Sequence, residues 1–139
     1  MKYLNRFNES TFPAFNDEII NEIKGNIEDI LLELEDMDFE TYVVIKNTSQ
    51  IQISINKIND PSFYWVEVKD VLIRLCEYYY SIIHQTSQTR IRLSAPSKES
   101  PFRMFDQSFK ELGVFYKEDY FDQINDGRKF NKIRILIKI

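Results

Sequence analysis

The chain has 139 residues, of which 43% are hydrophobic and 14% aromatic, with a formal net charge of -4 and only 3 glycines and 4 prolines. This length and composition suit one compact domain and argue against a low-complexity linker or a membrane span, because no apolar run approaches about 18 residues. We therefore expect a single domain over residues 1–139, with residues 1–14 as an N-terminal arm and no secretory signal.

The charge is unevenly distributed along the chain. Residues 1–40 hold 11 acidic and 3 basic side chains, whereas residues 41–139 hold 11 acidic and 15 basic ones. A solvated, Glu-rich helix face is the simplest account of the acidic part. The net positive charge of the basic part is compatible with nucleic acid as a partner.

The first periodic element is a helix from Asp17 to about Asp36. Asn16 is a suitable N-cap, and the acids of the first turn suit the positive end of the helix dipole. Apolar residues recur three, four or seven positions apart, which predicts one buried stripe. The stripe comprises Ile20, Ile23, Ile27, Ile30, Leu31 and Leu34.

A change to period two follows, and it predicts a β-hairpin over residues 41–58 with its turn at residues 47–50. Asp60-Pro61 then predicts a helix start with proline at the first helical position. The stripe of this second helix runs for about five turns. It comprises Val68, Leu72, Leu75, Tyr79 and Ile82.

Residues 89–95 alternate again, which predicts a third strand. Ser100-Pro101 predicts a further helix that ends at Gly113, with an apolar stripe made by Phe102, Phe105, Phe109 and Leu112. Residues 114–130 carry mixed signals and receive no assignment. The stretch "GRKFNKIRILIKI" predicts a fourth strand, with a central place favoured by its isoleucines.

These elements predict an α+β fold, in which an antiparallel or mixed sheet of four to five strands forms a two-layer sandwich with helices on one face. Ile133, Ile135, Ile137 and Ile139 should face the helices. The alternate residues should then form a basic open face. That face comprises Lys132, Arg134, Leu136 and Lys138, joined by Arg90, Arg92, Gln50, Gln52 and Ser54.

Enzymatic chemistry has little support in the sequence. The single histidine, His84, and the single cysteine, Cys76, are eight residues apart on one predicted helix, or about 12 Å, which is too far for a nucleophile and its base. No phosphate-binding glycine loop and no cluster of soft metal ligands is present. We expect no enzyme activity, no cofactor and no metal.

The triplet Tyr78-Tyr79-Tyr80 covers most of a helix circumference, so at least one of Tyr78 and Tyr80 must point away from the stripe that contains Tyr79. Tyrosine is enriched at protein interfaces. Packing against the N-terminal residues Tyr3, Leu4 and Phe7 is the alternative.

Three stretches together carry a family resemblance: "MKYLNRFNES", "IEDILLELEDMDFE" and "FYWVEVKDVLIRL". In style they resemble small accessory proteins of large tailed bacteriophages, a group with no agreed activity. The resemblance implies a viral protein in the host cytoplasm.

The segment Phe7-Asn8-Glu9-Ser10 is similar to the capsid-targeting leaders of internal proteins in T-even-like phages, which are cut after a glutamate preceded two residues earlier by an apolar residue. This resemblance implies cleavage between Glu9 and Ser10 and packaging in the virion. Phe7 stands where those leaders have Leu or Ile. The alternative is an N-terminal arm that packs on the domain.

The function we expect is binding of another protein, either a host factor or a second copy of the chain. Leu136 amid basic residues suits an acidic protein surface, and Arg92 and Arg134 should be solvent-facing. Nucleic-acid binding is a weaker alternative, because a base-stacking sheet needs exposed aromatic residues and the predicted open face has almost none.

Overall fold

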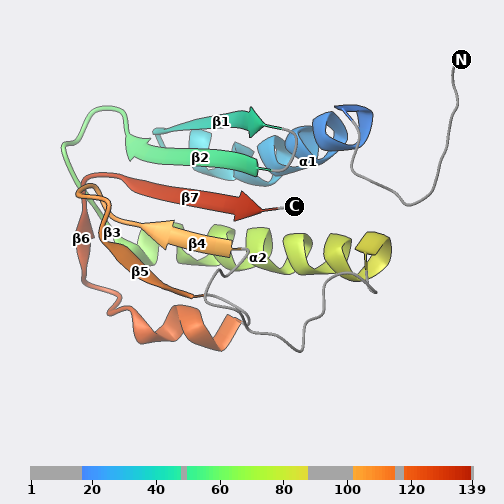
Figure 1. Ribbon diagram of the computed structural model, residues 1–139. Coiled ribbons are helices and arrows are strands. Elements are labelled where there is room, and N and C mark those ends of the chain that lie inside the picture. Colours follow the sequence, from blue (N-terminus) through green and yellow to red (C-terminus); the bar gives the residue numbers. More distant parts are fainter. Residues whose placement is uncertain (1–16, 48–49, 88–101, 115–117, 139) are drawn as a thin grey trace, which may run out of the picture.

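The computed structural model describes residues 17–47, 50–87, 102–114 and 118–138 (Figure 1). These residues form two α-helices, a five-stranded antiparallel sheet and a two-stranded sheet. The predicted α+β class is therefore confirmed. The expected strand at residues 89–95 and the expected N-terminal arm lie outside the described residues.

The first helix, α1 (Asp17–Glu35), has the predicted bounds. Its stripe is buried as expected, apart from Ile30, which is partly exposed. The chain then reverses through Asp38, whose φ of 67° is a left-handed conformation that aspartate tolerates better than most residues. The hairpin β1 (Phe39–Asn47) and β2 (Gln50–Lys57) follows as predicted.

The start of the second helix differs from its prediction. Asp60 and Pro61 lie in a bend, the short strand β3 (Phe63–Tyr64) comes next, and α2 (Trp65–Ser87) begins at Trp65. Pro61 is therefore not the first helical residue. Glu67 instead caps the helix, because its carboxylate accepts a hydrogen bond of 2.8 Å from the backbone N–H of Tyr64.

The predicted helix after Pro101 is wrong. The structure has a second hairpin there, β4 (Phe102–Phe105) and β5 (Glu111–Val114), with an irregular register between Met104 and Phe105. Phe102 and Met104 are buried, which is period two. Phe109, assigned to the core by the helix prediction, is 65% exposed.

Residues that the sequence analysis left unassigned contribute to the core. The 3₁₀ helix η2 (Glu118–Gln123) and the short strand β6 (Lys129–Phe130) bring Phe121, Ile124 and Phe130 into it. The Trp65 ring stacks on Phe121 with centroids 6.1 Å apart and meets Phe130 edge-on at the same separation. Strand β6 pairs with β3.

Strand β7 (Ile133–Lys138) lies in the centre of the large sheet, whose order is β1-β2-β7-β4-β5. Figure 1 shows both α-helices behind this sheet. Ile133, Ile135 and Ile137 are fully buried and belong to the same cluster as the helix stripes. The predicted direction of these isoleucines is confirmed.

Candidate interaction surface

The open face of the sheet, meaning the side away from α1 and α2, is built by strand register. Two rows of side chains cross four strands, because directly opposed residues in antiparallel strands point to the same side. The first row is Tyr42, Ser54, Arg134 and Phe105, and the second is Val44, Gln52, Leu136 and Arg103.

The β7 residues expected on the open face alternate with the buried isoleucines. Lys132, Arg134 and Leu136 are half-buried, and Lys138 is exposed. Gln50, Gln52 and Ser54 lie opposite Lys138, Leu136 and Arg134, as expected. Arg90 and Arg92 are outside the described residues, and Arg103 of β4 stands on this face instead.

Arg134 is not a freely solvated side chain, which corrects the sequence expectation. Its guanidinium carbon lies 3.9 Å from the centroid of the Phe109 ring. It also donates hydrogen bonds to the carbonyl oxygens of Asp106, at 3.4 Å, and Gln107, at 3.2 Å. Arg134 therefore fixes the turn between β4 and β5.

A second arginine is held in the same way. Arg103 makes two hydrogen bonds of 2.9 Å to the carboxylate of Glu111, and its guanidinium lies 5.1 Å from the centroid of the Phe105 ring. The Arg103 hydrogen bonds lower the pKa of Glu111. A paired, two-pronged contact of this kind is more specific in geometry than a single ion pair.

The open face has more aromatic surface than the sequence analysis expected. Tyr42 is 52% exposed and Phe109 65% exposed, and half-buried Phe105 lies beside Arg134. Phe105 and Phe109 were missed because they were assigned to a helix. Tyr42 could have been found, since the β1 alternation places it on the same side as Val44 and opposite Ser54.

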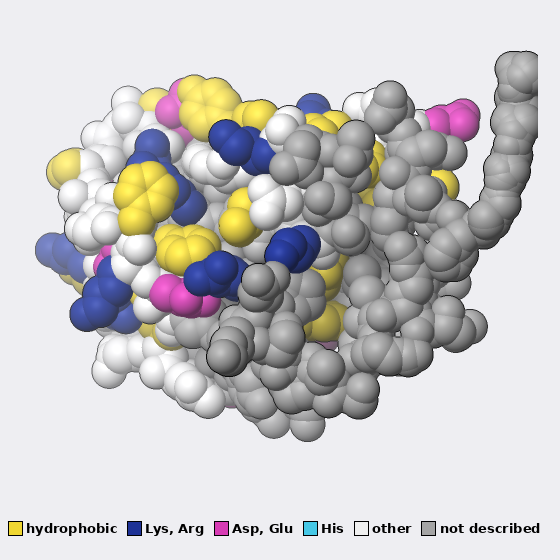
Figure 2. Space-filling view, viewed as in Figure 1, with side chains coloured by type: hydrophobic (Ala, Val, Ile, Leu, Met, Phe, Trp, Pro, Cys, Tyr) yellow, Lys and Arg dark blue, Asp and Glu magenta, His cyan; other side chains and the backbone are white. Residues whose placement is uncertain are grey.

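Figure 2 shows hydrophobic side chains next to Lys and Arg side chains on the face of the molecule seen in this view. A hollow of about 210 Å³ opens between them. It is lined by Gln52, Phe105, Phe109, Arg134, Ile135 and Leu136. Its wall is therefore mostly apolar, with one cation at the rim.

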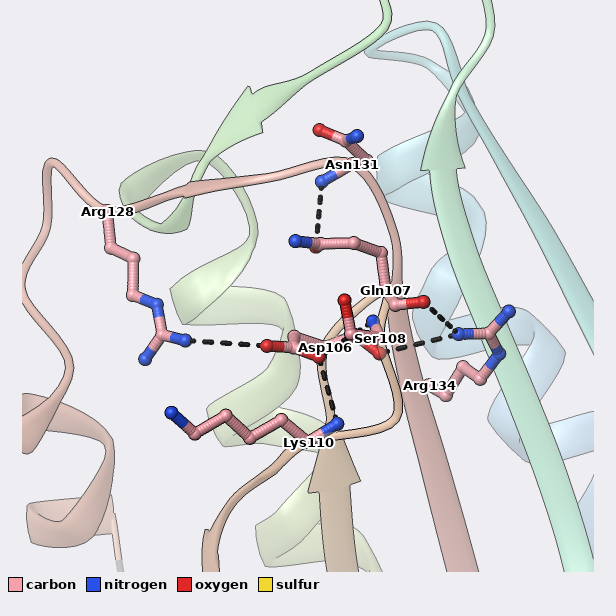
Figure 3. A network of polar contacts seen from close by, with 7 residues as sticks. All are labelled: Asp106, Gln107, Ser108, Lys110, Arg128, Asn131 and Arg134. Atoms are coloured by element: carbon pink, nitrogen blue, oxygen red, sulfur yellow. Dashed lines mark hydrogen bonds and ion pairs between the residues drawn. The ribbon is translucent and has the colours of Figure 1, made fainter.

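The turn that presents Phe109 is tied down by Asp106 (Figure 3). The buried Asp106 carboxylate accepts backbone hydrogen bonds from Ser108, at 2.8 Å, and Lys110, at 2.9 Å. Arg128 approaches its other oxygen at 3.7 Å. The network holds Phe109 at a φ of 62°.

Tyr78 and Tyr80, the other candidate interface residues, are both partly buried against the core. The Tyr78 hydroxyl accepts a hydrogen bond of 2.9 Å from Asn26 of α1, and Tyr80 meets Tyr79 edge-on at 5.0 Å. Neither tyrosine is therefore fully exposed. An interface role for either tyrosine stays a prediction.

Cys76 is buried in α2, and burial raises the pKa of its thiol to about 12. The thiolate required of a nucleophile is therefore scarce at neutral pH. Among residues 17–47, 50–87, 102–114 and 118–138, no group of three or more His, Cys, Asp or Glu side chains is arranged to hold a metal ion. Within the same described residues, no helix combines the length and apolarity needed to cross a membrane.

The described residues thus form an α+β domain in which α1 and α2 lie on one side of the sheet. Comparison with protein-family models, curated proteins and solved structures finds no match for the chain.

Proposed function

We propose that this protein is a non-enzymatic accessory protein that binds a protein partner through the open face, in the cytoplasm of a phage-infected host. The hollow between Phe105, Phe109 and Leu136 supports this proposal. An apolar hollow next to a few fixed polar groups suits an inserted side chain.

The conformation of Phe109 is the observation that carries the proposal. A residue other than glycine in the left-handed region costs roughly 1–2 kcal/mol, and Phe109 offsets little of this by burial because it is 65% exposed. The stability of the fold therefore does not explain why a phenylalanine stands at position 109. An exposed aromatic ring steadied by Arg134 suits an anchor for a partner.

The charges indicate the chemistry of the partner. The described residues of the open face include the cations Arg103, Lys132, Arg134 and Lys138, against the acids Glu40 and Glu111. A partner segment with an apolar side chain flanked by carboxylates is complementary to this arrangement. Because the charged groups border an apolar centre, we expect moderate salt dependence of binding.

The test replaces Phe109 with glycine. We expect Phe109→Gly to raise the midpoint of thermal unfolding, because it relieves the left-handed strain, and to lose at least tenfold in partner affinity. Partners would be captured from infected-host lysate with wild-type protein, identified by mass spectrometry and measured against both proteins by calorimetry.

The matched control is Val66→Ser, which removes an exposed apolar residue of α2 that is not among the open-face residues. It should leave partner affinity unchanged. A partner bound equally by wild type and Phe109→Gly would contradict the proposal.

Binding of single-stranded nucleic acid is a second candidate, favoured by the exposed rings of Tyr42 and Phe109, the second of which lies against Arg134. It predicts that labelled single-stranded RNA or DNA binds with an affinity that falls steeply as salt rises. Fluorescence anisotropy across a salt series distinguishes this candidate, because binding of nucleic acid should weaken steeply as salt rises, whereas binding of the protein partner should weaken only moderately.

Packaging in the virion is the remaining proposal, and it rests on the leader resemblance at Glu9 and Ser10, outside the described residues. It predicts the chain in purified particles with Ser10 as its first residue. Mass spectrometry of virions would contradict it by finding no peptide of this protein.

A further inference from the structure

Strand β1 forms one edge of the five-stranded sheet, and among the described strands it is hydrogen-bonded only to β2. Figure 1 shows no described strand beyond it. At nine residues it is the longest of the described strands, it contains no proline, and Tyr42 and Val44 are 52% and 50% exposed. A long edge with exposed apolar residues is a site for pairing with another strand.

The direction of its free backbone groups follows from one hydrogen bond. The backbone N–H of Ile58 donates to the carbonyl of Asp38 at 2.8 Å, just outside the opposed pair Phe39 and Lys57. That pair is therefore not itself hydrogen-bonded, and the pattern alternates along the ladder. Glu40, Tyr42 and Val44 therefore bond to β2, whereas Thr41, Val43 and Ile45 direct their N–H and C=O groups to the outer edge. Lys46 follows at the register irregularity between Ile45 and Asn47.

We propose that β1 pairs with β1 of a second copy of this chain, antiparallel, about a two-fold axis at Val43. The outward groups then meet as hydrogen-bonded pairs, Val43 with its own copy and Thr41 with Ile45 of the copy. The two sheets join into one continuous sheet. This interface is isologous, so it closes as a dimer.

The side chains fit this register. Glu40 lies opposite Lys46 of the copy, and Tyr42 lies opposite Val44 of the copy, so opposite charges and apolar groups are matched at both ends. A shift by one residue would place outward amides opposite inward ones. A shift by two places Glu40 opposite Val44 in one direction and Tyr42 opposite Lys46 in the other, so only the stated register pairs Glu40 with Lys46 and Tyr42 with Val44.

The helix behind this edge adds a second complementary surface. The Thr41 hydroxyl donates a hydrogen bond of 3.1 Å to Glu35, which marks the side of α1 nearest β1. Lys24, Glu28 and Leu32 follow this side at intervals of three or four residues, and Leu32 is 51% exposed. Two copies of α1 brought alongside would cover Leu32, and the Lys24–Glu28 ion pair of 2.9 Å could exchange partners.

The first test uses proline at neighbouring positions of the full chain. Val43→Pro removes an N–H that points outward, so the fold should survive while the dimer is lost in sedimentation experiments over a concentration series. Val44→Pro is the matched control, because it removes an N–H that bonds to β2 and should instead lower the melting temperature strongly. A wild-type chain that stays monomeric throughout the series overturns the inference.

A charge exchange gives a test that does not depend on proline being tolerated. Glu40→Lys and Lys46→Glu should each raise the dimer dissociation constant by about tenfold, because two symmetry-related pairs are lost, and the double variant should restore it. Melting curves separate this effect from loss of the Glu40 hydrogen bonds with Tyr42 and Asn56. Equal dissociation constants for the single and double variants overturn the proposed register.

The dimer and the open-face partner are independent. Phe109→Gly should leave the dimer intact, and Val43→Pro should leave partner binding at Phe109 intact. A dimer lost in Phe109→Gly but kept in Val43→Pro would overturn the edge interface.

Discussion

Asp106 shows how one carboxylate can hold a turn. It is buried, and its oxygens accept two backbone hydrogen bonds and face Arg128. We expect Asp106→Ala to cost about 1–3 kcal/mol of unfolding free energy, because the two amides and the arginine lose their acceptor. Asp106→Asn should cost less, since its side-chain oxygen can still accept from the amides. Urea unfolding of both variants measures the difference, and equal losses would contradict this role.

At the scale of single residues, sequence reasoning succeeded where local alternation decides the outcome. The isoleucines of β7 are buried and Lys132, Arg134 and Leu136 alternate with them, because one period-two strand has only two faces. It failed for the environment of Arg134. The ring of Phe109 and the carbonyls of residues 106 and 107 are more than 20 residues away in sequence, and no local pattern brings them near.

At the scale of elements, α1 carries a residue that weakens it. Gly25 lies in the middle of the helix, and a Cβ added there would meet no described atom within 4 Å apart from its chain neighbours and the backbone of its own helix. We expect Gly25→Ala to stabilise the protein by about 0.5–1 kcal/mol, because alanine has the higher helix propensity and no clash offsets it. Thermal unfolding measures this. A destabilised Gly25→Ala variant would show that another copy or another segment packs closely at this position.

Strand β2 and helix α2 are joined by the ion pair of Lys57 and Glu67, whose atoms are 2.6 Å apart. Burial alone would raise the pKa of Glu67, but hydrogen bonds from Lys57 and the Tyr64 amide outweigh it and lower that pKa. The hydrogen bond to Glu67 is the main cause of the raised pKa of Lys57.

These shifts set the pH range of the stabilisation. A lowered acid pKa contributes stability above the unfolded value of about 4.3, and this is lost as pH falls through the folded pKa. A raised lysine pKa contributes stability below about 10.4, and this is lost as pH rises through the folded pKa. We expect Glu67→Gln to reduce the fall in unfolding free energy on acidification. Glu77→Gln, on an exposed part of the same helix, controls for net charge. If the unfolding free energy of Glu67→Gln fell on acidification as much as that of the wild type, the stabilising role of the Glu67 carboxylate would be contradicted.

The hairpin of β4 and β5 shows why an element can be misassigned. Phe102, Phe105, Phe109 and Leu112 recur every three or four residues, which fits a helix. The spacing of Phe102 and Met104 fits a strand equally well. The turn at Asp106 decides in favour of the strand, because the Asp106 side chain accepts hydrogen bonds from the backbone of Ser108 and Lys110 and so ends the regular element there. Helix α1 and the first hairpin were predicted correctly, since their patterns run long enough to exclude the other period.

At the scale of the whole molecule, β7 bonds the two hairpins together. Ile135 is fully buried, with Ile53 opposite it on one side and Met104 on the other. We expect Ile135→Ala to cost about 2–5 kcal/mol of unfolding free energy, as a cavity in a packed centre does. Val44→Ala at the exposed edge should change it far less. Similar losses for both variants in urea unfolding would contradict the central role of β7.

The class of fold was predictable, because helix and strand periods are local. The packing of η2 and β6 against Trp65 was not, since its residues are separated by more than 50 positions and share no repeating pattern. Strand order also depends on such long-range contacts. A central β7 was favoured by its isoleucines, whereas its two neighbours could not be derived.

The central position of β7 also has a consequence for protein synthesis. A ribosome makes the chain from its amino end, so β2 is complete 81 residues before β7, given their ends at Lys57 and Lys138. At roughly 5–20 residues per second, the inner edge of β2 waits about 4–16 s for its neighbour. During that delay Ile51, Ile53 and Ile55 have no β7 strand beside them to pair with. Nascent chains halted before residue 133 should therefore be held by ribosome-associated chaperones, and released chains should not.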